Sequence, residues 1–310
     1  MLGRLNPDGL TGVDRPVSIE HVRARLLEKI GKPLGLDAVG AAAAILRVAD
    51  DKMAGALRIV SLARGRDPRD FAFFAFGGAG PLHATTLARM LGIPKVLIPA
   101  RPGMTNALGC VVADLRRDFV RTINTPLDEL PATLIRDVLA EHAAKGRKII
   151  EEEQADVVEI EEAFTAGLQF KGQSHELAVR IDDPRIGIAE LRKAFDDAYW
   201  QRFRMRLPEA RAVLVNLHIG VIGRRKRIDL RALASGNGKP SCQGPKTSRQ
   251  VWFEGGWREA RVHQRDALVP GMRFIGPAIV EQLDATTVIE PGQAVEVDHI
   301  GNLVIDVRQP

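Results

Sequence analysis

The feature that most constrains the fold of this chain is the segment FAFFAFGGAGPLHA at residues 71–84. Its first part, residues 71–76, is a short continuous apolar run, which is typical of a strand buried on both faces. The run leads directly into a glycine corner, which comprises Gly77, Gly78, Ala79 and Gly80. Pro81 then favours the first turn of a helix, which we expect over residues 82–91. The sequence thus predicts a strand, a tight corner and a helix in direct succession.

A corner of this kind is suited to a ligand as well as to tight packing. Glycine allows a ligand to touch the backbone because no Cβ atom intervenes. The free N–H groups and the positive end of the following helix favour an anionic group. A nucleotide is one ligand that could use both properties. The alternative is a strand-to-helix turn that serves packing alone, and the local chemistry does not separate the two interpretations.

Other motifs for phosphate binding or catalysis are absent from the sequence. It contains no GxxxxGK[ST] segment, and the corner lacks the GxGxxG spacing of a dinucleotide-binding fold. Neither GxSxG nor HExxH occurs, so the motifs of serine hydrolases and zinc peptidases are missing. Glu281 and Asp284 have no spacing that demands a metal. We therefore expect no metal site in this chain and can assign no catalytic residue.

Hydrophobic periodicity predicts the organisation of the chain. Apolar spacings of three and four from Asp37 to near Gly65 predict a long helix. Strands and helices alternate over residues 71–123, as in a layered α/β unit. Further on, a segment rich in Ser, Gly, Asn, Lys and Pro separates a mixed region from short apolar stretches between Gly and Pro turns. The expected parts are an α/β part, an α+β region, a linker and a small all-β domain, at residues 1–125, 126–231, 232–249 and 250–310.

Composition places the chain among ordinary globular proteins. Hydrophobic residues make up 45% and charged residues 27% of its 310 residues, which suffice for two domains. No apolar run approaches the roughly 18 residues that span a bilayer, so we expect no membrane partner. The two cysteines, Cys110 and Cys242, lie far apart and outside any CxxC spacing, which suits a reducing cytoplasm.

The net charge is weakly basic. The 44 Lys and Arg residues exceed the 39 Asp and Glu residues by 5, and a basic balance is one sign of nucleic-acid binding. The excess is spread along the chain, however, and the one dense run, residues 224–227, has no glycine-aromatic RNA-binding signature beside it. We interpret this run as a solvated strand end and expect no nucleic-acid partner.

Several separated motifs resemble those of a known family. Residues 64–123, RGRDPRDFAFFAFGGAGPLHATTLARMLGIPKVLIPARPGMTNALGCVVADLRRDFVRTI, resemble the hydantoinase A/5-oxoprolinase family, which includes the ATP-binding subunits of acetone-carboxylase-type enzymes. The other matching segments are MLGRLNPD at the start, ILRVADDKMAGALRIVSLARG in the long helix, FKGQSHEL at 170–177, VLVNLHIGVIGRRK at 213–226 and GPAIVEQLDATTVIEPG at 276–292. The resemblance therefore covers nearly the whole chain.

The resemblance implies a fold and a cofactor. The fold is α/β, half of an actin/sugar-kinase-like ATPase core followed by a β-rich C-terminal domain. In that superfamily a glycine corner contacts the adenosine part of ATP, which would be bound with Mg²⁺. The resemblance thus implies a cofactor-binding set of Gly77, Gly78, Ala79, Gly80, Pro81 and His83. For His83, which lies one turn into the helix, the alternative is a histidine bonded locally within that helix.

The resemblance also implies an activity. Family members use ATP to activate a cyclic amide or ketone by phosphorylating its oxygen, which turns that oxygen into a good leaving group. They generally work with a B-type partner subunit. We expect a partial A-type subunit of an ATP-dependent cyclic amidase that acts on hydantoin-type or 5-oxoproline-type rings. One alternative is a subunit of an ATP-dependent ketone carboxylase of the acetone carboxylase type. An alternative of another class is a catalytically silent remnant or scaffold.

The chain departs from the family pattern in one respect. A-type subunits are roughly twice as long and carry two Gly-Gly-Thr phosphate loops in their N-terminal half. The only Gly-Gly pairs here are Gly77-Gly78 and Gly255-Gly256, and neither is followed by Thr. We therefore expect either a split subunit, whose N-terminal half and magnesium ligands come from a complementing polypeptide, or a truncated gene product. In both cases we expect that this chain alone does not hydrolyse ATP.

Overall fold

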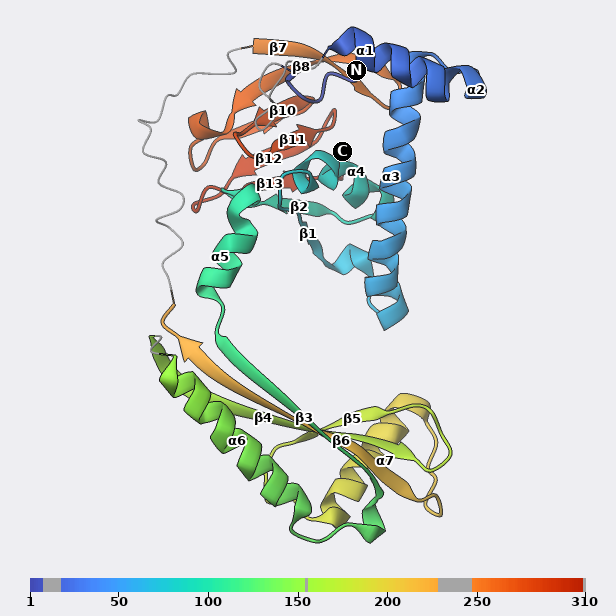
Figure 1. The fold of residues 1–310 in the computed structure, drawn as a ribbon. Helices are drawn as coiled ribbons and strands as arrows, with labels where there is room; N and C mark the ends of the chain where they lie inside the picture. The colour runs from blue at the N-terminus through green and yellow to red at the C-terminus, as the bar shows by residue number, and fades with distance from the viewer. Residues whose placement is uncertain (8–17, 154–155, 228–246, 309–310) are drawn as a thin grey trace. The chain divides into compact units, whose positions relative to one another are not determined.

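The computed structural model describes residues 1–7, 18–153, 156–227 and 247–308. The chain divides into two compact units (Figure 1). Unit 1 comprises Met1–Cys110 and Asp229–Pro310, and unit 2 comprises Val111–Ile228. Each unit has its own hydrophobic core. The fold is mixed α/β with three separate sheets.

Unit 1 opens with helices. These are α1 (Ile19–Leu26), the π-helical turn η2 (Leu27–Gly31), α2 (Lys32–Leu34) and the long α3 (Ala38–Ser61). Asp37 caps α3, since its carboxylate accepts a hydrogen bond from the N–H of Gly40 at 2.6 Å. The predicted long helix is thus present and starts as expected. The sequence analysis predicted no helix before Asp37, and α1 is a polar helix with no buried residue.

The first sheet of unit 1 contains the strand that precedes the glycine corner. Strand β1 (Ala72–Phe74) runs parallel to β2 (Lys95–Ile98), and α4 (Gly80–Leu91) connects them. Parallel neighbours need such a crossover. The sheet continues from β2 with β13 (Leu303–Asp306), β12 (Ala294–Val297) and β9 (Arg273–Ile275). Strands from both ends of the sequence therefore share the sheet that positions the corner.

The second sheet of unit 1 packs near α4. Its strands, in sheet order, are β11 (Thr286–Ile289), β10 (Ala278–Glu281), β8 (Gly256–Gln264) and β7 (Thr247–Phe253). The hydroxyl of Thr85 on α4 donates a hydrogen bond to the carbonyl of Val288 on β11 at 3.0 Å. Ala84 and Ala88 of α4 are fully buried in the core of unit 1. Small residues on this face let α4 lie close to the strands.

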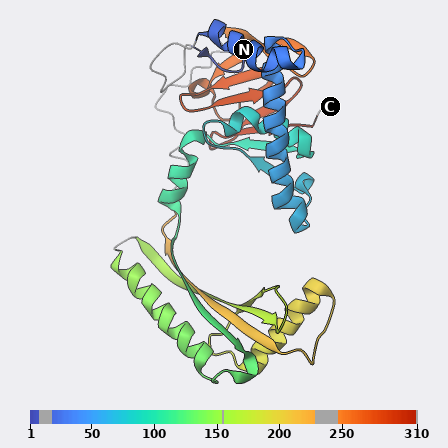
Figure 2. The ribbon, with the colours of Figure 1, turned by 45° about the vertical axis from the view of Figure 1, so that its right-hand side comes forward.

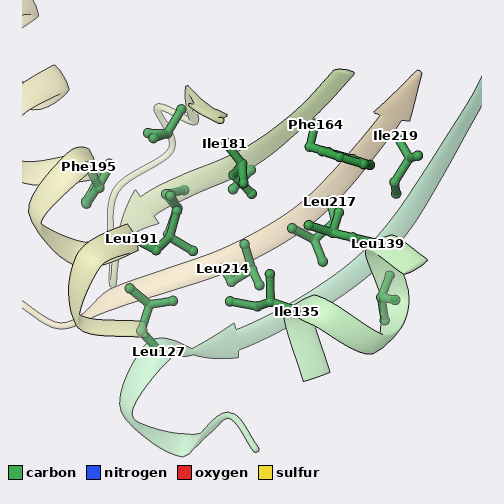
Figure 3. Packing of buried hydrophobic residues seen from close by; sticks show 14 of the residues in the cluster. Leu127, Ile135, Leu139, Phe164, Ile181, Leu191, Phe195, Leu214, Leu217 and Ile219 are labelled. Carbon is green, nitrogen blue, oxygen red and sulfur yellow. The ribbon is translucent and has the colours of Figure 1, made fainter. Parts of the chain in front are cut away.

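Unit 2 is one antiparallel sheet with two helices (Figure 2). Its strands, in sheet order, are β3 (Leu115–Pro126), β6 (Ala212–Arg225), β4 (Val157–Phe170) and β5 (Leu177–Ile181). The helices are α6 (Leu134–Glu152) and α7 (Ile188–Phe203). Figure 3 shows how Ile135 of α6 and Leu191 of α7 approach Leu214 of β6, and all three belong to a single core.

Short helices link these elements. Helix α5 (Thr105–Val112) contains the boundary between the two units. The 3₁₀ helices are η3 (Leu62–Arg64), η4 (Pro68–Asp70), η5 (Pro102–Met104), η6 (Leu127–Glu129) and η7 (Arg265–Ala267). No helix among the described residues is both long and apolar enough to cross a membrane.

The structure draws its boundaries differently from the predicted parts. The third strand expected in the α/β part, near residues 119–123, belongs to β3 and therefore to unit 2. Residues 250–310 do not stand apart as an all-β domain, because β13 pairs with β2 through Leu303 and Ile98. The predicted linker lies outside the described residues except for its last three, which begin β7.

The structure also corrects the burial expected for the strand before the corner. Phe71 and Phe74 are 45% and 46% exposed, so residues 71–76 are not buried on both faces. The physical reason is that β1 lies at the edge of its sheet and has only β2 as a neighbour among the described strands.

Candidate functional site

The backbone of the glycine corner is held from behind by two loops. Gly77 adopts a φ of +78°, a conformation that favours glycine. Its N–H donates a hydrogen bond to the carbonyl of Pro102 at 2.8 Å. A Cβ atom on Gly78 would lie 3.1 Å from the carbonyl oxygen of Asp284. The corner therefore has a defined shape, set by the loop after β2 and the loop before β11.

The other face of the corner is open. A Cβ atom on Gly77 would meet no atom within 4 Å, and Gly78 and Ala79 are exposed. No side chain caps the N-terminus of α4, which begins at Gly80 with Pro81 in its first turn. Bare backbone and an uncapped helix start thus face outward together, and such a helix start favours negative charge.

Asp284 adds a side chain to this site that the sequence analysis did not connect with it. A Cβ atom on Gly103 would lie 2.1 Å from the Asp284 carboxylate, so only glycine permits this approach. One carboxylate oxygen, Oδ1, is buried and has no hydrogen-bond partner. Buried polar atoms are normally paired, so an orphan acceptor beside the corner points to a missing donor. Asp284 is far from the corner in sequence, and no local pattern could have revealed this contact.

His83 does not join this group of residues. Its Nδ1 atom lies 2.7 Å from the carboxylate of Asp50 on α3, and the two side chains are only 14% and 6% exposed. The structure therefore gives His83 a partner on the neighbouring helix α3, in place of the alternative of a local bond within α4. Its visible function is to hold α4 against α3.

The corner itself contains no metal centre. Among the residues that the structure describes, no three His, Cys, Asp or Glu side chains gather in a way that could hold a metal ion. The carboxylate of Asp284 lies against Gly103 in the loop after β2, and the carbonyl oxygen of the same residue lies near Gly78. One carboxylate with one orphan oxygen can accept a hydrogen bond from a ligand hydroxyl or amino group.

The basic run, residues 224–227, belongs to unit 2. Strand β6 extends through Arg225, as the interpretation as a strand end predicts. The guanidinium of Arg224 lies 2.6 Å from both Asp114 and Glu161. Hydrogen bonds from Arg225 and Arg224 lower the pKa of Asp114. Arg224 is thus engaged in ion pairs within its own sheet.

Comparison with known proteins identifies the kind of protein to which this fold and corner belong. The chain is a mixed α/β protein that presents bare backbone at the start of a helix. Its residues 1–119 match the family described as Hydantoinase/oxoprolinase, and residues 129–304 match the Hydantoinase/oxoprolinase C-terminal domain. The chain belongs to the hydantoinase/oxoprolinase family.

Curated relatives include enzymes with assigned activities. An uncharacterized protein of Methanocaldococcus jannaschii is 36% identical over 99% of this chain and 43% of its own length. Caprolactamase subunit alpha of Pseudomonas jessenii is 29% identical over 96% of this chain and 44% of its own length. The acetone carboxylase beta subunit of Xanthobacter autotrophicus is 28% identical over 94% and 42%, respectively. The chain thus spans less than half the length of these relatives.

A solved structure agrees with the fold. The crystal structure of ATP-dependent caprolactamase from Pseudomonas jessenii matches with a TM-score of 0.77 and 26% sequence identity. The match covers 98% of this chain and 45% of that one. Both units of the chain therefore have counterparts in one larger protein.

Proposed function

We propose that this chain is the C-terminal part of the A-type subunit of an ATP-dependent cyclic amidase, in which the glycine corner contacts the adenosine part of ATP. The single observation that carries this proposal is the open face of the corner, where Gly78 and Ala79 are exposed at an uncapped helix start. The likeness to ATP-dependent caprolactamase over nearly the whole chain supports the nucleotide and the substrate class.

The residues present fit the adenosine part of a nucleotide. The backbone at Gly77, where a Cβ atom would meet no atom within 4 Å, leaves room for a flat base. The orphan oxygen of Asp284 would accept a hydrogen bond from a ribose hydroxyl or an adenine amino group. ATP supplies a phosphoryl group that makes the amide oxygen a better leaving group. Groups that hold Mg²⁺ and the γ-phosphate would come from outside the described residues.

The edge of the first sheet supports a complementing N-terminal part. Strand β1 has an unpaired edge among the described strands, and Phe71, Phe74 and Phe76 are 45%, 46% and 38% exposed. An open edge with large exposed apolar groups is a surface that proteins normally cover. Each of these relatives is more than twice as long as the segment that this chain matches. We infer that their N-terminal part covers β1, and that a B-type subunit completes the enzyme, as the subunit names of the relatives suggest.

A ketone carboxylase is the second candidate. The acetone carboxylase beta subunit is 28% identical to this chain, against 29% for caprolactamase subunit alpha, so identity does not separate the two activities. In both proposals ATP activates the oxygen of the substrate. The substrate is a ketone for the carboxylase and a cyclic amide for the amidase. Fixation of labelled bicarbonate in the presence of a ketone would support the carboxylase, and hydrolysis of a lactam would support the amidase.

The test uses a complex of this chain with the N-terminal part of the Methanocaldococcus relative, which precedes the segment that this chain matches. We expect the two to associate and to release phosphate from ATP when caprolactam or 5-oxoproline and a B-type subunit are added. Gly78→Val should reduce this rate by about a hundredfold, because its side chain would press against the Asp284 carbonyl and displace the backbone that is proposed to contact the nucleotide.

The matched control is Gly55→Ala in α3, where a Cβ atom would meet nothing within 4 Å. This control should leave the rate unchanged. A complex that hydrolyses ATP equally well with Gly78→Val would contradict the role of the corner. A folded complex without any ATP hydrolysis would favour the catalytically silent alternative.

A further inference from the structure

A second candidate site lies in unit 1, in a cavity of about 750 Å³. It is bounded by the N-terminal half of α3, the C-terminal half of α4 and the turn between β7 and β8. None of the glycine-corner residues lines it. Its volume lies within the range of small-molecule sites. Much of its wall is apolar and includes Leu2, Leu36, Leu46, Met90 and Trp252.

The buried acidic groups of this cavity already have partners. The carboxylate of Asp50 is held by His83 at 2.7 Å. Glu290 accepts hydrogen bonds from the Thr86 hydroxyl at 2.8 Å and from Nε of Arg89 at 3.0 Å. The same arginine reaches Glu254 at 3.1 Å. Each of these acids thus already has a hydrogen-bond or ion-pair partner.

Arg4 is the exception. Its Nε and Nη1 atoms are buried, and neither has a hydrogen-bond partner. Burial lowers the pKa of Arg4, and the charges of Asp50 and Glu290 partly oppose that effect. Arginine nevertheless stays protonated in proteins, so the cavity wall contains a cation that lacks an acceptor. Such a group is costly unless something binds to it.

The remaining charged groups of the cavity wall belong to α3. Arg47 and Asp51 are both exposed, so water solvates them. They carry opposite charges and therefore add little net field. Among the residues that the structure describes, the cavity thus combines an apolar wall with one guanidinium whose Nε and Nη1 atoms are buried without an acceptor, and no second buried cation with free donors lines it, as a doubly charged phosphate would require.

We propose that this cavity binds a small molecule with a single carboxylate on an apolar body, and that the carboxylate accepts hydrogen bonds from Arg4. The guanidinium supplies charge-assisted hydrogen bonds, and the apolar wall removes the body of the ligand from water. The proposal does not depend on nucleotide binding, because the site shares no residue with the glycine corner.

The test compares three probes by titration calorimetry with the full chain. These are cyclohexanecarboxylate, its neutral isostere cyclohexanecarboxamide, and inorganic phosphate. We expect the carboxylate to bind and the carboxamide to bind at least about tenfold more weakly, as the loss of a charge-assisted hydrogen bond implies. Arg4→Gln should abolish this difference. Arg66→Gln, which changes an exposed arginine that does not line the cavity, is the matched control and should preserve it.

A second readout separates a ligand-binding arginine from a structural one. Without ligand, Arg4→Gln should leave the Tm unchanged or raise it, because it removes a buried charge that has no hydrogen-bond acceptor. A clear fall in Tm with Arg4→Gln would assign Arg4 to the fold and overturn the proposal. Equal binding of carboxylate and carboxamide, binding of phosphate alone, or no binding of any probe would overturn it as well.

Discussion

His83 and Asp50 form a nearly buried contact between α3 and α4, and we expect its loss to lower the stability of the fold. His83→Leu would leave the Asp50 carboxylate, which is only 6% exposed, without its partner. We expect the free energy of unfolding to fall by about 1–3 kcal/mol, the typical cost of leaving a buried acceptor without its hydrogen bond. Urea denaturation of both proteins measures this difference.

The double variant His83→Leu/Asp50→Leu provides the control for that prediction. It removes both polar groups and should recover part of the loss, because no unpaired carboxylate stays buried. Equal losses in the single and double variants would show that packing, and not the polar contact, makes these positions important.

At single positions, local chemistry could be predicted and distant partners could not. The glycine corner stands out in the sequence because Gly77, Gly78 and Gly80 follow an apolar run directly. The cap at Asp37 is equally local, since its partner Gly40 is three residues away. Asp284 reaches the corner from a loop some two hundred residues later, and Asp50 reaches His83 from another helix. Neither contact leaves a periodic signal in the sequence.

Two helical glycines give opposite predictions at the scale of whole elements. Gly55 lies within α3, and a Cβ atom there would meet nothing within 4 Å. Gly55→Ala should therefore raise the free energy of unfolding by about 0.5–1 kcal/mol through helix propensity. Gly146 lies within α6, where a Cβ atom would approach Val221 of β6 to 2.5 Å. Gly146→Ala should lower the free energy of unfolding by about 1–2 kcal/mol.

Thermal or urea unfolding of the two variants measures both effects. The wild-type chain is the common reference, and each glycine serves as the control for the other because the chemical change is identical. Two stabilising substitutions would show that α6 has room against its sheet, which would contradict the packing described for unit 2.

Elements were predictable where their ends carry local signals. Helix α3 begins directly after Asp37 and helix α4 ends at Leu91, as expected, because a capping aspartate and a glycine mark these ends. Helix α1 was missed although Ile19, Val22 and Leu26 recur at helical spacing, since the helix is short and buries no residue fully. The pairing of β2 with β13 was also missed, because strands so far apart in sequence give no sign of their neighbours. Strand character could be predicted, but sheet membership could not.

For the whole molecule, the open edge of β1 and the partial coverage of the relatives both support the proposal that a further segment covers this edge. The chain matches 43–44% of the length of its first two relatives, and Phe71, Phe74 and Phe76, in or next to β1, are exposed. The family resemblance in the sequence anticipated a C-terminal part. The domain boundaries that hydrophobic periodicity predicted differ from the two units, because a single sheet unites segments from both ends of the sequence.

Hydrogen exchange tests directly whether the glycine corner binds ATP. It is measured with and without ATP on the complex of this chain with the N-terminal part of the Methanocaldococcus relative. We predict that ATP slows exchange in peptides that cover residues 76–84, because the nucleotide lies on the backbone of the corner. Gly78→Val should remove this protection, whereas Gly55→Ala should keep it. Binding of ATP without any protection of residues 76–84 would contradict the account.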